Sequence, residues 1–361
     1  MPRKTSFFNG TLLRSDLRHY WPAGFLYVLV WLMVLPIPLL QTGFDYVHSW
    51  PDRPELLAAE LHNIYYSAMT GSMVLAVLSG IVIPMAVYAY LMAPRSVGLM
   101  HALPVKRTTQ YISHFAAGFG LLTGGNVLIF LLSVLAQLPY GGPDWAAAGL
   151  WLLVTELLEL FFLALGTLCA MATGWLLAIP VLYGAVNAIA ILLHTVVQAM
   201  ANIFYYGYYT TGPAKAVMWL TPVGRIWTAI GNDTSYWITA DGRVSPEYLE
   251  EGWRVSHLSP TAYTTCAIYA AVGLVLLALV WWLYQKRPSE SAGDAMAFRW
   301  LRPIARWSIG LCGGWGLGLF LHYAVLYNSN LTQLPICQVI LGVICFFAAQ
   351  MLLQKKFRIF N

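Results

Sequence analysis

Long apolar runs recur along the chain and are separated by shorter polar connections. A helix needs roughly 20 apolar residues to cross a hydrocarbon core about 30 Å thick, and several of these runs reach that length without Asp, Glu, Lys or Arg. The pattern therefore predicts an all-α polytopic membrane protein with about eight transmembrane helices. The predicted spans are Trp21–Leu40, Ser67–Met92, Ile112–Gln137, Ala147–Met171, Trp175–Ala201, Thr261–Tyr284, Ser308–Leu326 and Leu334–Leu353.

The basic residues predict how these spans are oriented. Cytoplasmic connections carry an excess of Lys and Arg, and placing the N-terminus in the cytoplasm puts fifteen of the twenty Lys and Arg residues on that side. Both termini are therefore predicted to be cytoplasmic. The first apolar run is too long for the core of a signal peptide and lacks a small-x-small cleavage site, so we expect it to remain as an anchor.

Composition agrees with a membrane protein, because 59% of the residues are hydrophobic and only 10% are charged. The net charge of +5 comes from basic residues that flank spans, where lipid headgroups attract them. Nothing in this pattern favours a nucleic acid partner. The five cysteines fall within predicted spans and form no CxxC pair, so they are better explained as small buried residues than as disulfide or metal ligands.

We divide the chain into four segments. Residues 1–20 form a predicted cytoplasmic interfacial helix, residues 21–284 a six-span core, residues 285–307 a basic cytoplasmic linker, and residues 308–361 two further spans with a basic end. Within the core, the long outer segment 202–260 is rich in Tyr and Trp. The stretches AKAVMWL and EYLEEGW in this segment look like short amphipathic helices, so a folded cap or a re-entrant hairpin is expected.

The N-terminal helix is predicted from an amphipathic pattern with Thr11 as its N-cap. Leu13 and Leu17 share one face of this helix, while Arg14 and Arg18 occupy the other. This pattern is typical of a helix that lies in the membrane interface. An ordinary basic flank that anchors topology is the alternative.

A patterned stretch, SVGLMHALPVKRTTQY at residues 96–111, connects the second and third predicted spans. With Ser96 as N-cap, its apolar residues are expected to form one face of a short helix parallel to the membrane, which a proline ends and a basic pair follows. A simple connection needs none of these features. The residues concerned are Val97, Leu99, Met100, His101, Leu103, Pro104, Lys106 and Arg107.

These features, in this order, resemble the permease subunits of bacterial type-2 ABC exporters of the multidrug and peptide type. LMHALPVKRTTQYISH is similar to the coupling segment of that family, and WLTPVGRIW resembles its Ser/Thr-Pro element after the fifth span. The resemblance covers about residues 11–284 and implies that the protein lies in a bacterial inner (plasma) membrane. It implies that Val97, Leu99, Met100 and Leu103 dock a separate ATPase subunit, with His101, Lys106 and Arg107 at the edge of the docking face. The alternative is that the stripe lies in the headgroup region beneath its own bundle.

The resemblance also implies a second permease chain, the same or similar, and an ATPase that binds ATP and Mg²⁺. This chain contains no GxxxxGK[ST] phosphate loop and no Gly-Lys dipeptide, so no enzymatic activity and no cofactor are expected in it. The family pattern has six spans. The two additional spans imply either a larger subfamily or a chain that is the first part of a longer permease.

Two carboxylates fall inside the fourth predicted span. Glu156 and Glu159 are three residues apart and therefore share a helix face. Charged residues in a span are costly, usually face the bundle interior and are functional candidates. The two carboxylates are expected to line a substrate path, to join a buried polar network with Asn126, Asn187 or His194, or to contact another subunit.

Two other functions remain open on the sequence. An ATP-independent transporter or channel would use Glu156 and Glu159 as ion-coupling groups. An intramembrane serine protease would need a Gly-x-Ser-Gly site, and the nearest match, VLSG at 77–80, lacks the first glycine. The leading hypothesis is an exporter permease that moves a drug, a peptide or another amphiphile.

Overall fold

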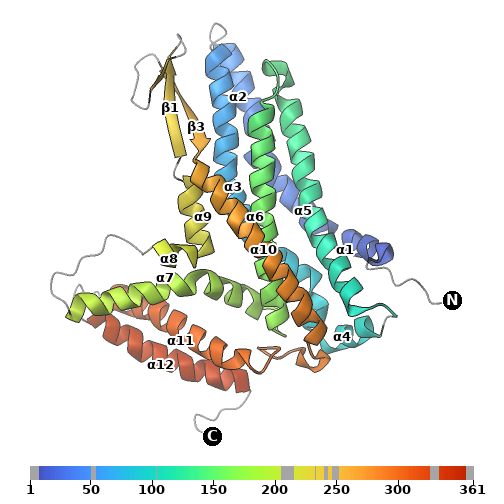
Figure 1. Ribbon diagram of the computed structural model, residues 1–361, viewed down its shortest axis with the longest axis vertical. Helices are drawn as coiled ribbons and strands as arrows, with labels where there is room; N and C mark the ends of the chain where they lie inside the picture. The colour runs from blue at the N-terminus through green and yellow to red at the C-terminus, as the bar shows by residue number, and fades with distance from the viewer. Residues whose placement is uncertain are drawn as a thin grey trace. The chain divides into compact units, whose positions relative to one another are not determined.

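The computed structural model describes residues 8–49, 54–102, 104–204, 215–231, 233–239, 243–245, 252–325 and 333–354, and helices dominate them (Figure 1). The long helices are α1 (Gly10–Val34), α2 (Pro36–Ser49), α3 (Pro54–Val87), α5 (Arg107–Gln137), α6 (Trp145–Ala172), α7 (Ala178–Phe204), α10 (Pro260–Lys286), α11 (Leu301–Leu319) and α12 (Gln333–Gln354). The shorter elements are η1 (Ala89–Leu91), α4 (Pro94–His101), η2 (Leu138–Tyr140), α8 (Lys215–Trp219), α9 (Pro222–Gly231), η3 (Ser289–Ser291), the π-helical turn η4 (Phe320–Val325), and strands β1 (Asp233–Thr239), β2 (Val244–Ser245) and β3 (Gly252–Leu258).

Among the described residues, seven helical stretches are long and apolar enough to cross a membrane. They correspond to the first seven predicted spans, which confirms an all-α polytopic membrane protein. The eighth predicted span corresponds to α12, whose apolar part, Ile336–Met351, is shorter than the other seven. The stretch formed by α1 and α2 is 40 residues long. At 1.5 Å per residue it measures about 60 Å, roughly twice the thickness of a hydrocarbon core.

The N-terminal helix differs from the predicted separate interfacial helix. It starts at Gly10, with Asn9 rather than Thr11 as its N-cap, because Asn9 Oδ1 accepts hydrogen bonds from the backbone N–H groups of Thr11 and Leu12. The helix then continues through Pro22 to Val34. Leu13 is half-buried, whereas Arg14, Leu17 and Arg18 are exposed, so the expected interfacial pattern lies on the first turns of the spanning helix itself.

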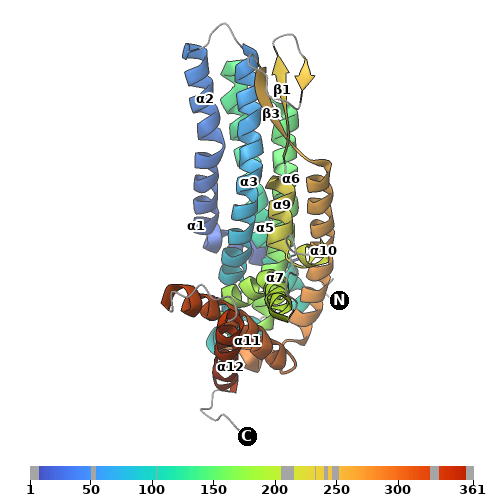
Figure 2. The same ribbon diagram turned by 90° about the vertical axis from the view of Figure 1, so that its left-hand side faces the viewer.

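The chain forms two compact units. The first unit comprises Met1–Val87, Val105–Leu165 and Ile226–Trp281. In it α1, α2, α3 and α5 pack side by side (Figures 1 and 2). The α6 helix joins this bundle through an edge-to-face contact of Trp31 with Trp151, whose ring centroids are 4.9 Å apart, and through a 2.8 Å hydrogen bond between the Ser72 and Thr155 hydroxyls.

The second unit comprises Tyr88–Pro104, Gly166–Arg225 and Trp282–Asn361. In it α11 packs closely along α12 and also contacts α7. Glycines permit this close approach, because a Cβ atom on Gly314 would lie 2.5 Å from Gly342 Cα. The basic residues Arg302 and Arg306, which the sequence analysis assigned to the linker 285–307, lie on α11, which runs without interruption into the seventh predicted span.

The predicted outer segment, residues 202–260, contains a β-sheet that the sequence analysis missed. The strands are antiparallel in the order β2-β1-β3, and β1 pairs with β3 from Asp233 opposite Leu258 to Thr239 opposite Gly252. The helix predicted for AKAVMWL is confirmed as α8. The helix predicted for EYLEEGW is wrong at its end, because Gly252 and Trp253 begin β3, and the rest of that stretch lies outside the described residues. Aromatic and β-branched residues in both strands favour the sheet.

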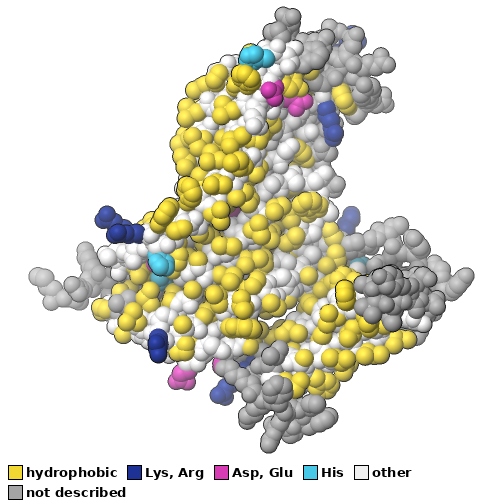
Figure 3. Space-filling model, turned by 180° about the vertical axis from the view of Figure 1, so that it is seen from behind, with side chains coloured by type: hydrophobic (Ala, Val, Ile, Leu, Met, Phe, Trp, Pro, Cys, Tyr) yellow, Lys and Arg dark blue, Asp and Glu magenta, His cyan; other side chains and the backbone are white. Residues whose placement is uncertain are grey.

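Apolar side chains cover much of the described surface. Figure 3 shows a face on which hydrophobic side chains spread over the helices and charged side chains are few. Exposed residues of this kind on the spans include Phe25, Met33, Leu78, Val82 and Leu131. Such a surface is unfavourable in water and suits contact with lipid tails, in agreement with the membrane assignment.

Candidate functional site

The short helix predicted between the second and third spans is present as α4, which spans Pro94–His101 and follows the single turn η1. It begins three residues earlier than predicted, with Ala93 rather than Ser96 as N-cap and Pro94 in the first turn, where a proline is favourable. Ser96 does not cap the helix. Its hydroxyl donates to the backbone oxygens of Tyr90, at 2.8 Å, and Ala93, at 3.0 Å. The serine therefore ties the first turn of α4 to η1.

The prediction that the apolar residues of α4 share one face is wrong for Val97 and Leu99. Val97 is 2% exposed and Leu99 is 73% exposed. Two residues apart on an α-helix are about 200° apart, so these side chains lie on opposite sides. Val97 packs inward, Leu99 projects outward, and Met100 is half-buried.

The remaining residues of this stretch surround the end of α4. The side chain of His101 and all of Leu103 lie outside the described residues. Pro104 and Lys106 are exposed and Arg107 is half-buried. The next helix, α5, begins at Arg107 with Lys106 as its N-cap. The basic pair thus marks the start of the third span.

A buried arginine after α10 joins this region to the end of α6, and the sequence analysis had treated it only as a basic flank. Arg287 is 4% exposed. Its guanidinium donates hydrogen bonds to the backbone oxygens of Ala170 (2.7 Å), Met171 (3.1 Å) and Thr173 (2.8 Å) at the end of α6, and of Leu91 (3.3 Å) in η1. The last carbonyls of a helix have no partner within it, and Arg287 supplies donors for several of them. Burial lowers the pKa of Arg287 to about 10, which leaves it charged at neutral pH.

The predicted basic linker is attached to the turn between α6 and α7. Gly174 N–H donates to Asp294 O at 2.9 Å, and Gly293 N–H donates to Gly174 O at 2.8 Å. The Thr173 hydroxyl donates to Ala295 O at 2.8 Å. A Cβ atom on Gly174 would overlap the backbone oxygen of Ser291, so only glycine fits this position. Backbone contacts therefore fix the turn and the linker to each other within the second unit.

The intramembrane carboxylates meet in a polar network within the first unit. Asn126 Nδ2 donates to Glu156 Oε1 at 3.0 Å and to Glu159 Oε2 at 2.8 Å. The Thr123 hydroxyl donates to Glu156 Oε2 at 2.8 Å. The Tyr27 hydroxyl contacts Glu159 Oε1 and also lies 2.6 Å from Asn126 Oδ1. Residues from α1, α5 and α6 thus share one buried network, as expected for costly charges in a span.

The two glutamates differ in their access to the surface. Glu159 is fully buried, whereas Glu156 is half-buried. Of the predicted partners, Asn126 contacts both glutamates. Asn187 and His194 lie on α7 in the second unit, and Asn187 Nδ2 donates to Tyr183 O on its own helix at 2.9 Å. Thr123 and Tyr27 were not predicted, although a polar residue within an apolar span is a signal that could have selected them.

A second buried acid lies near the start of α1. Asp16 Oδ2 is 2.6 Å from His114 Nδ1 on α5, and both side chains are buried. The hydroxyl of Ser113 accepts a hydrogen bond from Asn9 N–H at 3.1 Å. These contacts fasten the first turns of α1, which carry the basic residues of the predicted interfacial helix, to the start of α5.

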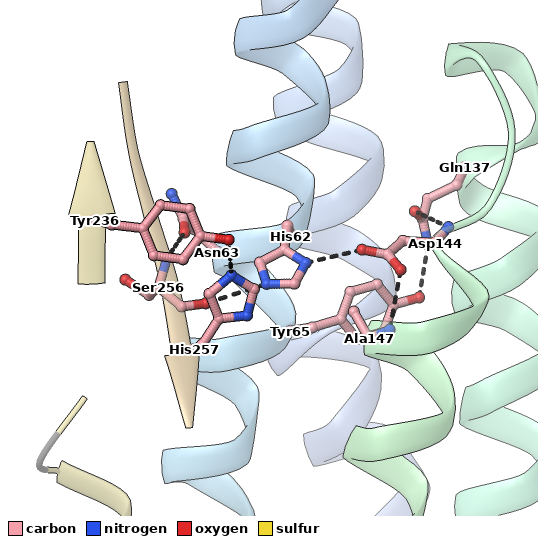
Figure 4. Close-up of polar contacts among 9 residues, drawn as sticks. All are labelled: His62, Asn63, Tyr65, Gln137, Asp144, Ala147, Tyr236, Ser256 and His257. Carbon is pink, nitrogen blue, oxygen red and sulfur yellow. Dashed lines mark hydrogen bonds and ion pairs between the residues drawn. The ribbon is translucent and has the colours of Figure 1, made fainter. Parts of the chain in front are cut away.

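A third polar cluster lies where β3 meets α3 (Figure 4). His62 Nδ1 is 2.8 Å from Asp144 Oδ2, and His62 Nε2 is 3.1 Å from Ser256 O. Asp144 N–H donates to Gln137 Oε1 at 3.1 Å, and Asp144 Oδ1 accepts from Ala147 N–H at 3.0 Å. The hydrogen bond to His62 is the main reason that the pKa of the Asp144 carboxyl is lowered from its ordinary value. No short motif marks this cluster, because its members are far apart in the sequence.

No group of three or more His, Cys, Asp or Glu side chains within the described ranges has an arrangement suited to a metal ion. Ser79, in the near-match to a protease motif, is buried and donates to Ala76 O on its own helix at 3.1 Å. Comparisons of the chain with protein-family models, curated proteins and solved structures found no match.

Proposed function

We propose that this protein is the membrane-spanning permease subunit of an ATP-driven exporter. A separate ATPase subunit, which binds ATP and Mg²⁺, docks on α4, and a second permease chain, the same or similar, completes the transporter. The cargo is a drug, a peptide or another amphiphile.

The geometry of α4 supports this proposal most strongly. A short helix joins two spans, its inner side is held by Val97 and Ser96, and Leu99 projects outward at 73% exposure. An exposed leucine on a helix that is otherwise held in place fits the groove of a partner protein. Because Arg287 bonds to both η1 and the end of α6, a movement of the partner would pass as a rigid-body motion to the spans.

Purification of the tagged chain from its native membrane in mild detergent, followed by quantitative mass spectrometry, tests the proposal. We expect an ATPase with a phosphate loop in stoichiometric amount. Leu99→Asp should release that ATPase, because a charge would be buried in the contact. Leu220→Asp is the matched control, since Leu220 is 68% exposed on the predicted outer side and should leave the complex intact.

The network of Glu156 and Glu159 favours the second candidate function, an ATP-independent transporter. If no ATPase accompanies the chain even after crosslinking, the docking role of α4 is refuted. Glu156, the half-buried member of the network, then becomes the first group to test for ion coupling. Glu156→Gln should abolish an ion-driven flux in that case and should leave an ATP-driven flux largely unchanged.

A further inference from the structure

His62 contacts two groups that only accept hydrogen bonds. Its Nδ1 faces the Asp144 carboxylate at 2.8 Å, and its Nε2 faces the backbone oxygen of Ser256 at 3.1 Å (Figure 4). A neutral imidazole carries one N–H, whereas an imidazolium carries two. Both contacts are therefore hydrogen bonds only when both ring nitrogens carry a proton. Asp144 remains an acceptor, because its other oxygen already accepts from Ala147 N–H and the pKa of its carboxyl is lowered.

The surroundings of the second histidine of the cluster, His257, disfavour a charge on its ring. The rings of His62 and His257 have centroids 4.8 Å apart, and His257 Nε2 lies 2.6 Å from the Tyr236 hydroxyl. Burial lowers the pKa of His257, and the charge on His62 lowers it further, while Asp144 acts in the opposite direction. A charge on His257 is therefore disfavoured. When its Nε2 is unprotonated, it accepts a hydrogen bond from the Tyr236 hydroxyl.

Other titratable residues lie near His62, and none of them takes the place of its imidazole in the two hydrogen bonds. Tyr263 on α10 and Tyr65 on α3 line the same small cavity of about 20 Å³ as His62. The Tyr65 hydroxyl already accepts from Gln137 Nε2 at 2.6 Å. Arg254 on β3 is exposed, and its backbone oxygen accepts a hydrogen bond from Asn63 of α3.

Two neighbouring residues of α3 hold β3, and only one of them titrates. Asn63 Nδ2 donates to Arg254 O at 2.9 Å, and Asn63 Oδ1 accepts from Ser256 N–H at 3.0 Å. These two bonds are independent of pH. The bonds from His62 to Ser256 O and to Asp144 exist together only while His62 carries both protons. When one proton is lost to solvent, the remaining N–H stays on Nδ1, because the Asp144 carboxylate is a stronger acceptor than a backbone oxygen. The bond to Ser256 O and the charge of the ion pair are then lost, and Asn63 remains as a hinge.

We propose that His62 is a pH-sensitive latch that, in its doubly protonated form, pins β3 to α3 and to the connection between α5 and α6. When His62 loses a proton, the sheet formed by β1, β2 and β3 opens more often about Asn63. This property depends only on the contacts of the first unit and is independent of the proposed transport function.

Hydrogen exchange of the full chain in lipid nanodiscs, measured by mass spectrometry, tests the latch. The measurement compares about pH 5.5 with about pH 8.5, a range in which histidine changes its charge, after correction for the intrinsic exchange rates. Protection of residues 252–258 should fall about tenfold at the higher pH, as expected for the loss of one charged hydrogen bond at a partly exposed site.

Variants identify the responsible group. His62→Gln should remove the pH dependence, because glutamine does not titrate. His48→Gln is the control, since His48 is exposed on α2, where its ring bonds to Phe44 O and lies against the Phe44 ring of the same helix. It should retain the full pH effect. A flat wild-type profile, a pH effect that survives His62→Gln, or one that disappears only in His257→Gln would each overturn the proposal. If His62→Gln fails to fold, Asp144→Asn provides the test. The latch predicts that the pH effect on the exchange of residues 252–258 is weaker in this variant, and an unchanged pH effect would refute the latch.

Discussion

Replacing Arg287 by leucine should destabilise the second unit strongly. The substitution removes donors from four backbone oxygens, those of Ala170, Met171, Thr173 and Leu91. Each hydrogen bond from a charged donor contributes about 1.5–3 kcal/mol. The cost of burying the guanidinium offsets part of this sum.

The net loss on breaking such a buried network is about 3–5 kcal/mol, because the carbonyls remain buried without partners. For a chain of 361 residues this corresponds to a midpoint of thermal unfolding about 5 °C lower. Arg287→Lys should fall between the wild type and Arg287→Leu, because one ammonium group cannot reach both η1 and the end of α6 in the way that the planar guanidinium does.

Thermal unfolding in one detergent, followed by tryptophan fluorescence, measures the effect. Lys286→Leu is the matched control. Lys286 is exposed, and its ammonium lies 4.1 Å from the centre of the Trp282 ring. Its loss should shift the midpoint by less than about 1 °C. Hydrogen exchange should increase at residues 89–92 and 170–174 in Arg287→Leu alone. Equal midpoints for Arg287→Leu and the control would refute the role of Arg287 as a clamp.

Acid should loosen the contact between Asp144 and His62. The hydrogen bond to His62 is the main cause that lowers the pKa of Asp144 in the folded protein. The contribution of Asp144 to stability is therefore complete above the pKa that Asp144 has in the unfolded chain, and it disappears as the pH falls through the lower pKa of the folded state. An acid titration of hydrogen exchange at residues 252–258 checks this, and Asp144→Asn should lack the acid transition. Glu159→Leu should remove one acceptor each from the Asn126 amide and the Tyr27 hydroxyl, which retain Glu156 Oε1 and Asn126 Oδ1, and destabilise the first unit by about 1–3 kcal/mol, whereas Glu159→Gln should cost less, as thermal unfolding would show. Gly314→Leu should separate α11 from α12, and equal crosslinking of cysteines placed on the two helices in variant and wild type would contradict this.

The spans could be predicted from the sequence because each depends on a local property, a run of about 20 apolar residues. The position of α4 was predictable for the same reason, since Pro94 and Pro104 punctuate a short segment between two spans. Its exposed face was assigned less well, because Val97 and Leu99 are both apolar and only their helical angle separates them.

The polar clusters were harder to predict because their members are distant in the chain. Glu156 and Glu159 were selected correctly as a pair on one face, but Tyr27 comes from another helix, 132 residues before Glu159. His62 and Asp144 are 82 residues apart. The strands β1 and β3 were missed because each has only seven residues and the sequence between them contains helix-forming acids. Long-range pairing, not local preference, determines these contacts.

The neighbouring basic residues Lys286 and Arg287 have different consequences for membrane topology. A count of the basic residues beside a span gives Lys286 and Arg287 equal weight in keeping that end of the span on one side of the membrane. Lys286 is exposed and available to anionic lipid headgroups, whereas the charge of Arg287 is enclosed by carbonyl oxygens. Only the first is therefore expected to hold the end of α10 at its membrane surface after folding. Arg287 therefore counts as a basic flanking charge before insertion, but in the folded protein its charge is used to fasten the end of α10 to α6.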